Sequence, residues 1–89
     1  GWLVTETEFA NNAGGIGVTG RVVRTARYKY ICYSQGARRE QLFDMAKDPG
    51  ETLNLARAAE AQEVLQEHRQ HLAEWCRQTK DAFPVPGID

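Results

Sequence analysis

A glycine-rich run is the first feature of this sequence whose residue types and spacing could do chemistry. Residues 15–20 (GIGVTG) match the G-x-G-x-x-G pattern of nucleotide-binding loops. In a dinucleotide fold these glycines end a strand and open a helix whose N-terminus faces the pyrophosphate. Here residues 21–33 are β-branched and aromatic, which favours a strand, and a kinase-type glycine loop needs far more chain. We therefore interpret the run as an ordinary loop.

Histidine and cysteine are the other residue types that could form a site. His68 and His71 lie one helical turn apart, but the sequence has no H-E-x-x-H motif and no obvious third ligand. We expect His68 to be packed and His71 to be solvated. Cys32 and Cys76 lack the paired spacing of zinc ligands and are interpreted as small buried groups, with one disulfide between them as the alternative. The sequence therefore predicts no catalytic, cofactor-binding or metal-binding residue.

Charge is distributed unevenly, although the net charge of −1 excludes a uniformly basic or acidic binding surface. From residue 40 to residue 89 there are ten acids against five bases. Residues 10–39 contain no acid and these bases: Arg21, Arg24, Arg27, Lys29, Arg38 and Arg39. Interleaved tyrosines make this segment a possible nucleic-acid-binding surface. We favour a second interpretation, in which the tyrosines are core or interface residues and the arginines pair with acids elsewhere.

The elements that must position these residues follow from periodicity and turn chemistry. Strands are predicted at 2–9, 20–24, 27–33 and 41–44, with a loop at 11–17 and a two-residue turn at Thr25-Ala26. A turn is predicted at 48–50 (DPG), and a helix over 55–80 with Asn54 as its cap. Residues 81–89 are expected to form an extended tail. The prediction for residues 1–89 is one α+β domain, with about four antiparallel strands and one long C-terminal helix across one face.

Apolar residues occur on both faces of the predicted hairpin. One face carries Val23, Tyr28, Tyr30 and Cys32, and the other carries Val22, Ile31 and Tyr33 together with Arg24, Arg27 and Lys29. A sheet that is covered on both sides has this pattern, whereas the chain supplies only one helix. Its apolar stripe comprises Ala61, Leu65, His68, Leu72, Trp75, Cys76 and Thr79. One cover of the sheet is therefore missing.

Two phrases in the sequence carry a family resemblance. Residues 20–31 (GRVVRTARYKYI) and 40–56 (EQLFDMAKDPGETLNLA), followed by a helix ending near Trp75, resemble the C-terminal subdomain of type I sulfatases, in the alkaline-phosphatase superfamily. The resemblance spans residues 3–80. It implies a four-stranded sheet with one long helix, packed beside an α/β catalytic domain. In the family that domain contains a formylglycine, a calcium ion, and Lys and His partners.

The catalytic motifs of that family do not occur here. The sequence has neither C-x-P-S-R nor C-x-A-x-R, and no calcium-binding acid pair, so no catalytic residue can be carried over. The resemblance implies a non-catalytic subdomain that supports a sulfuric ester hydrolase and is inactive alone. The resemblance implies that its partner is the catalytic domain of the same polypeptide, and we expect the basic cluster to pair with acids of that domain, with an anionic substrate as the alternative ligand. The sequence opens inside a predicted strand, which suggests that it is a fragment.

Further expectations concern the position of the subdomain in the parent protein, its self-association and its cellular location. Residues 11–18 are expected to lie near the substrate cleft, and the isolated chain is expected to self-associate through its uncovered sheet face. No apolar run is long enough to span a membrane, and the sequence does not indicate a compartment. A nucleic-acid-binding module and a free-standing interaction domain remain the alternatives.

Overall fold

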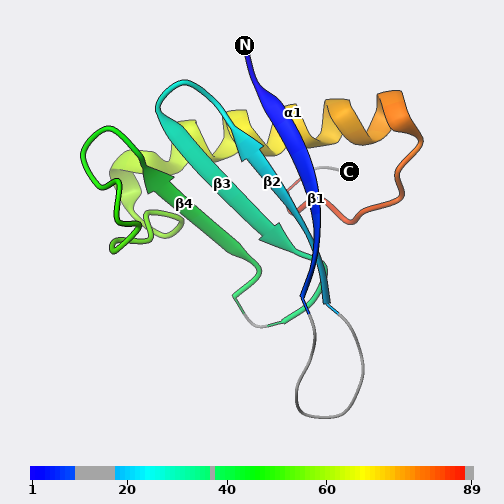
Figure 1. The fold of residues 1–89 in the computed structure, drawn as a ribbon, viewed down its shortest axis with the longest axis horizontal. Coiled ribbons are helices and arrows are strands. Elements are labelled where there is room, and N and C mark those ends of the chain that lie inside the picture. Colours follow the sequence, from blue (N-terminus) through cyan, green and yellow to red (C-terminus); the bar gives the residue numbers. More distant parts are fainter. Residues whose placement is uncertain (10–17, 37, 88–89) are drawn as a thin grey trace.

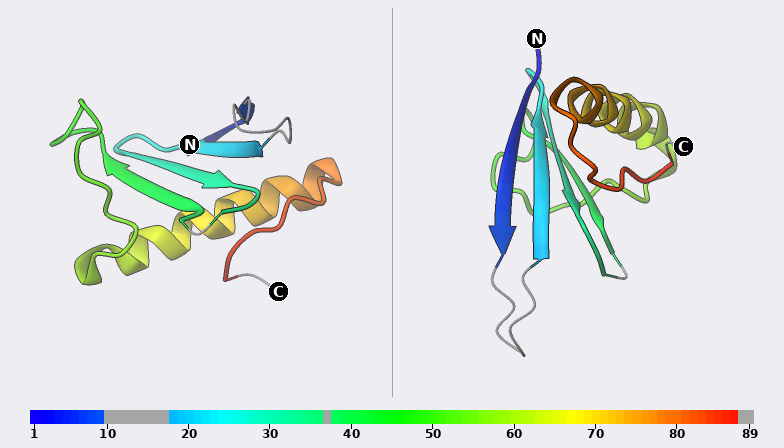
Figure 2. Two further views of the ribbon diagram at one scale, coloured as in Figure 1. Left: turned by 90° about the horizontal axis from the view of Figure 1, so that it is seen from below. Right: turned by 90° about the vertical axis from the view of Figure 1, so that its right-hand side faces the viewer.

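The computed structural model describes residues 1–9, 18–36 and 38–87. Four strands, β1 (Leu3–Phe9), β2 (Val18–Arg24), β3 (Tyr28–Tyr33) and β4 (Glu40–Asp44), form one antiparallel sheet in chain order. A short 3₁₀ helix (Ala59–Ala61) leads into the helix α1 (Gln62–Thr79). Figure 1 shows α1 crossing behind the sheet, and Figure 2 shows that it covers one face only. The predicted α+β architecture is confirmed.

The turn between β2 and β3 lies one residue later than the sequence predicts. The Thr25 amide donates to the Tyr28 carbonyl at 3.0 Å, which leaves Ala26 and Arg27 as the two turn residues. Thr25 is held in the ladder because its hydroxyl accepts from the Tyr28 amide and lies 2.9 Å from Nε2 of His68. The prediction of a Thr25-Ala26 turn was therefore wrong. The resulting register differs by two residues, so the side chains within the two strands keep their predicted faces, whereas Arg27 becomes a turn residue.

The core lies between the sheet and α1. Val23, Tyr30 and Leu42 on the sheet are fully buried, and α1 covers them with Leu65 and Leu72. The predicted helix stripe is correct except at its C-terminal end, where Trp75 is half-buried and Thr79 is exposed. The Thr79 hydroxyl donates to the Trp75 carbonyl instead of packing. The remaining core side chains are Cys32, Ala61, Cys76 and Phe83.

The helix begins later than predicted, and Asn54 does not cap it. Oδ1 of Asn54 accepts from the amides of Leu42 and Ala56, each at 3.0 Å. The Leu55 amide donates to the Leu42 carbonyl at 2.8 Å. These bonds hold the segment after Asn54 against β4, so the chain cannot enter a helix there. Among the residues that the structure describes, no side chain caps the N-terminus of α1 at Ala61.

The remaining predicted segments fall around these elements. The turn after β4 is confirmed, because the Glu51 amide donates to the Asp48 carbonyl at 2.9 Å and the Asp48 carboxylate accepts from the Thr52 and Leu53 amides. Residues 81–87 contain no helix or strand, and Phe83 is buried against the core. The predicted loop at 11–17 lies outside the described residues. No helix in the described ranges is long and apolar enough to cross a membrane.

Candidate functional site

His68 is packed, as the sequence predicts. Its ring is 1% exposed, with Nδ1 2.7 Å from the Val64 carbonyl and Nε2 2.9 Å from the Thr25 hydroxyl. Because a carbonyl can only accept, Nδ1 carries the proton and Nε2 accepts from Thr25. Burial lowers the pKa of His68. The neutral ring is therefore the form that fits this site.

His71 is half-buried, so the prediction that it is solvated was wrong. Its ring stacks on Trp2 with centroids 4.9 Å apart, and Nε2 lies 3.6 Å from the Glu67 carboxylate. The N-terminal segment supplies Trp2, a contact that the helix pattern could not reveal. The His71 ring lies edge-on to the His68 ring, and both ring nitrogens of His68 already form hydrogen bonds, to Thr25 and Val64. Within the described ranges, no group of three or more His, Cys, Asp or Glu residues could hold a metal ion.

The two cysteines are free and buried. Burial raises the pKa of the Cys32 thiol and of the Cys76 thiol. A protonated thiol is a weak nucleophile and a weak metal ligand. Neither cysteine is therefore activated for covalent chemistry.

The basic half of the chain is paired with the acidic half. Arg21 lies 3.0 Å from Asp81, and Lys29 lies 3.1 Å from Glu51. The sequence predicts such partners in a neighbouring domain, and for these residues that prediction is wrong about where the acids lie. Strand pairing and the packing of the tail bring the two halves together. Part of the uneven charge along the sequence is thus neutralised where Arg21 and Lys29 lie beside acids.

Arg27 forms the shortest of these pairs. Its Nη2 lies 2.7 Å from the Asp44 carboxylate, and its Nε donates to both carboxylate oxygens at 3.1 Å. These bonds, with backbone amides from Lys47 and Ala46, lower the pKa of Asp44 to about 2. The pair joins the turn after β2 to the end of β4.

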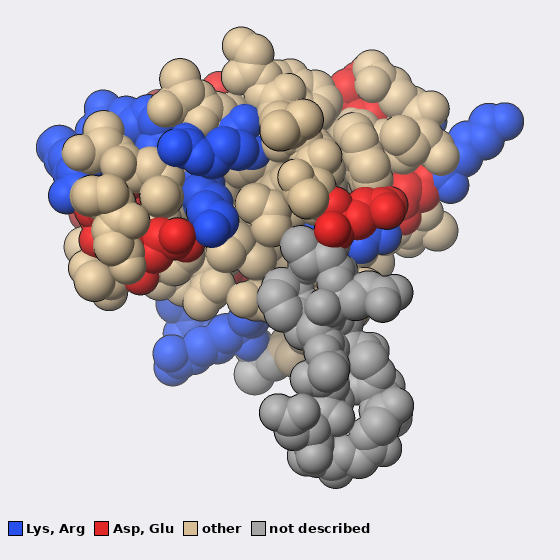
Figure 3. All heavy atoms as spheres, in the orientation of Figure 1, with Lys and Arg blue, Asp and Glu red and all other residues tan. Residues whose placement is uncertain are grey.

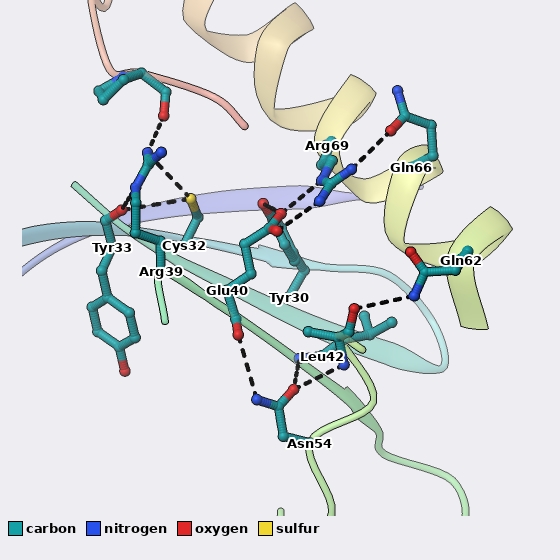
Figure 4. A network of polar contacts seen from close by, with 12 residues as sticks. Tyr30, Cys32, Tyr33, Arg39, Glu40, Leu42, Asn54, Gln62, Gln66 and Arg69 are labelled. Carbon is teal, nitrogen blue, oxygen red and sulfur yellow. Dashed lines mark hydrogen bonds and ion pairs between the residues drawn. The ribbon is translucent and has the colours of Figure 1, made fainter. Parts of the chain in front are cut away.

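A polar network joins α1 to β3 and β4 (Figure 4). Nε and Nη2 of Arg69 each donate to the Glu40 carboxylate at 2.7 Å, and the Tyr30 hydroxyl donates to the same carboxylate at 2.7 Å. Burial favours a raised pKa for Glu40, but the bonds from Arg69 and Tyr30 outweigh it and hold the pKa below its ordinary value. Burial also raises the pKa of Tyr30. The Glu40 charge is thus neutralised inside the fold.

The sheet face opposite α1 has no helix over it in the described part of the chain. Val22 and Ile31 are cross-strand partners on this face and are half-buried, and Leu3 beside them is 66% exposed. Figure 3 looks onto this face, where uncharged side chains cover much of the centre. We call this surface, comprising Leu3, Val22, Ile31 and Tyr33, the open face. It is the uncovered side that the sequence pattern predicts.

Two hollows also occur in the described structure. The larger, of about 460 Å³, is bordered by Arg27 and Asp44, which are paired with each other. The smaller, of about 260 Å³, brings Arg38 and Arg39 together with Arg57. The sequence predicts Arg57 within a helix and gives no sign that it lies beside Arg38 and Arg39. We call the smaller hollow the arginine pocket.

Comparisons with known proteins agree on one family. Residues 11–78 match the family described as N-sulphoglucosamine sulphohydrolase, C-terminal. Over 70 residues, 79% of this chain, the sequence is 45% identical to Delta 4,5-hexuronate-2-O-sulfatase of Bacteroides thetaiotaomicron. The chain spans only 14% of that relative's length.

Solved structures give the same result. A 2-O GAG sulfatase matches 97% of this chain with a TM-score of 0.76 and 35% identity. A putative sulfatase from Bacteroides thetaiotaomicron matches 97% with a TM-score of 0.77 and 35% identity. In both cases the match covers 18% of the solved chain.

Proposed function

We propose, since this chain belongs to the family of N-sulphoglucosamine sulphohydrolase C-terminal domains, that it is the supporting, non-catalytic subdomain of a sulfatase. Its partner would be a catalytic domain in the same polypeptide. The subdomain would pack its open face on that domain and stabilise it. Hydrolysis itself would be carried out by the partner.

The observation that carries this proposal is that the described residues cover the sheet with a helix on one side only. Ile31 and Val22 lie in the middle of the open face, where a buried aliphatic side chain contributes about 1.5–3 kcal/mol. Leu3 extends the same apolar surface. A face of this kind needs a cover, and a larger domain of the same polypeptide can supply it without the entropy cost of bringing two molecules together.

The side chains described here are suited to support and not to chemistry. A calcium ion takes six to eight oxygen ligands, whereas Glu40, Asp44 and Asp81 are already bonded to arginines. These residues do not fit a calcium site, and the thiols of Cys32 and Cys76 are buried. Calcium and formylglycine would therefore belong to the catalytic domain. We derive no step of hydrolysis from this chain.

The relatives' names suggest what the parent enzyme acts on. One of them is named for a 2-O-sulfated hexuronate and another for GAG. We extend this to the parent of the present chain and propose a sulfate ester on an anionic saccharide as its substrate. Residues 11–18 would help to shape access to the cleft.

A nucleic-acid-binding module is not favoured. Such a module needs unpaired cations for phosphate, and ion pairs already occupy Arg21, Arg27 and Lys29. Arg24 is exposed and donates to the carbonyls of Thr25 and Tyr28. Among the described residues, this leaves Arg24, Arg38 and Arg39 as the cations of the basic segment without an ion pair, which is too few to follow a backbone of phosphates.

An Ile31→Asp substitution in the parent enzyme tests the proposal. It places a charge at the centre of the open face, and we expect a lower Tm and loss of sulfate release from a sulfated uronate disaccharide. Gln70→Asp, on the exposed side of α1, is the matched control and should change neither. Circular dichroism of the isolated Ile31→Asp chain should show an intact fold. Unchanged Tm and activity in the Ile31→Asp parent would exclude docking through this face.

A further inference from the structure

The arginine pocket lies between the start of β4 and the segment that leads to α1. It is lined by Arg38, Arg39, Glu40, Asn54, Ala56 and Arg57. With a volume of about 260 Å³ it is smaller than a pocket for a drug-sized ligand and suits one charged group of a larger molecule. The starting observation is that three arginines, Arg38, Arg39 and Arg57, line one hollow.

The pocket carries unbalanced positive charge. Neither Arg38 nor Arg57 forms an ion pair with any acid that the structure describes, and both are exposed. Glu40 is the one acid in the lining, and Arg69 already neutralises it with two 2.7 Å bonds. The remaining charge is therefore available to an anion, in contrast with the paired Arg27 and Asp44 of the larger hollow.

Part of the pocket wall is fixed before any ligand arrives. Nε of Arg39 donates to the Tyr33 carbonyl at 2.8 Å, and its Nη2 donates to the Pro84 carbonyl. Asn54 is held by bonds to Leu42, Ala56 and the Glu40 carbonyl, as Figure 4 shows in part. A preorganised wall loses less entropy on binding. Arg38 and Arg57, which are exposed, are the other two cations of the lining.

We propose that the arginine pocket binds a sulfate group of an anionic saccharide. Guanidinium forks donate paired hydrogen bonds to oxyanions, and several of them around one hollow match the oxygens of a sulfate ester. The inference rests on the proposed function for the identity of the ligand, whereas the pocket's preference for oxyanions follows from its own residues. A sulfated saccharide would thus be held by the subdomain as well as by the catalytic domain.

Titration of the ¹⁵N-labelled 89-residue chain tests this inference by NMR. The probes are sodium sulfate, a 2-O-sulfated unsaturated uronate disaccharide and its desulfated counterpart, with sodium chloride added to keep the ionic strength constant. We expect saturable shifts of the amides of residues 38–40 and 54–57 with both sulfated probes, the disaccharide binding more tightly. The desulfated counterpart should cause none.

Variants locate the binding to the pocket. Arg38→Gln and Arg57→Gln should each weaken binding about tenfold, as expected for loss of a charge-assisted hydrogen bond. Lys80→Gln removes a cation that does not line the pocket and should leave the affinity unchanged. Unchanged affinity in both arginine variants would overturn the inference.

The other outcomes are equally decisive. The pocket would be rejected if no saturable shifts occurred, or if the desulfated disaccharide bound as well as the sulfated one. It would also be rejected if free sulfate bound more tightly than the sulfated disaccharide. Tighter binding of a short oligonucleotide at physiological salt would assign the arginines to phosphate instead. If Ile31→Asp impairs the parent enzyme but the titration shows no sulfate binding, only the pocket is rejected. If the titration shows sulfate binding but Ile31→Asp leaves the parent enzyme unchanged, only the proposed function is rejected.

Discussion

Arg69 of α1 and Glu40 of β4 face each other across 29 residues of sequence and share two hydrogen bonds of 2.7 Å. Both side chains are largely buried, with exposed fractions of 21% and 16%. The same carboxylate accepts from the Tyr30 hydroxyl, so one buried charge ties the helix to two strands. Loss of either partner would leave the other charge buried and uncompensated.

Substitution of Arg69 by Met should therefore destabilise the chain. We expect a loss of about 2 kcal/mol in the free energy of unfolding, less than for a fully buried pair because water reaches both groups. Urea denaturation followed by circular dichroism measures the change. Arg77→Met is the matched control, since Arg77 pairs with Glu74 on the exposed side of α1 and should cost less than about 0.5 kcal/mol. Equal effects of the two variants would contradict a structural role for the network.

The low pKa of Asp44 predicts that the folded chain loses stability in acid. The pKa of this carboxyl is about 2 in the folded chain and about 3.9 when unfolded, so the folded state binds fewer protons between these values. Stability should be complete above the unfolded value and should fall as the pH drops toward 2. Asp44→Asn should flatten this dependence in urea titrations across that window. An identical pH profile in the Asn variant would contradict the pairing with Arg27.

The pKa of His68 predicts a second transition at higher pH. Burial lowers this pKa in the folded chain, and His71 adds to the shift, whereas the hydrogen bond to the Val64 carbonyl and the charge of Glu67 oppose it. The unfolded state therefore takes up the proton first, and stability should decline as the pH falls below about 6.5. Substitution of His68 by Gln keeps a polar side chain but removes the titration, so the decline should disappear. A wild-type profile that is flat from pH 7 to pH 5 would count against this assignment.

The architecture could be predicted because its signals are local. Alternation in residues 28–33 and the three-and-four spacing from Ala61 to Cys76 each depend on near neighbours. The start of the helix could not be predicted correctly, because Asn54 has the chemistry of a helix cap and residues 55–61 have good helix propensity. What prevents a helix there is the bonding of Asn54 to β4, which depends on tertiary structure.

The polar contacts could be predicted less well than the fold. Arg21 and Asp81 are 60 residues apart, and no spacing rule connects them. The charge imbalance is visible in the sequence, but the sequence does not show that the acidic partners lie within the same chain. The arginine pocket was missed for the same reason, since Arg57 meets Arg38 and Arg39 only after the segment following Asn54 has packed on β4. Only the shared basic character of residues 38 and 39 gave a signal.

Thiol chemistry should report on unfolding. Both Cys32 and Cys76 are buried, and burial raises the pKa of each thiol, so a disulfide reagent should not reach a reactive thiolate in the folded chain. We expect both thiols to react slowly in buffer and at once in denaturant, as measured by absorbance. Rapid modification of one thiol in buffer, with the circular dichroism unchanged, would show that its site is open.

The open face predicts how the isolated chain behaves in solution. Two copies can cover each other's Ile31, Val22 and Leu3 when no catalytic domain is present, because removing apolar surface from water is favourable. We expect sedimentation velocity to show self-association that grows from micromolar to millimolar concentration. Ile31→Asp should shift the chain toward monomer, because association would bury an unpaired carboxylate, and Gln70→Asp should not. A wild-type chain that stays monomeric throughout that range would show that this surface is too polar or too small to drive association, and would weaken the case that it packs on a larger domain.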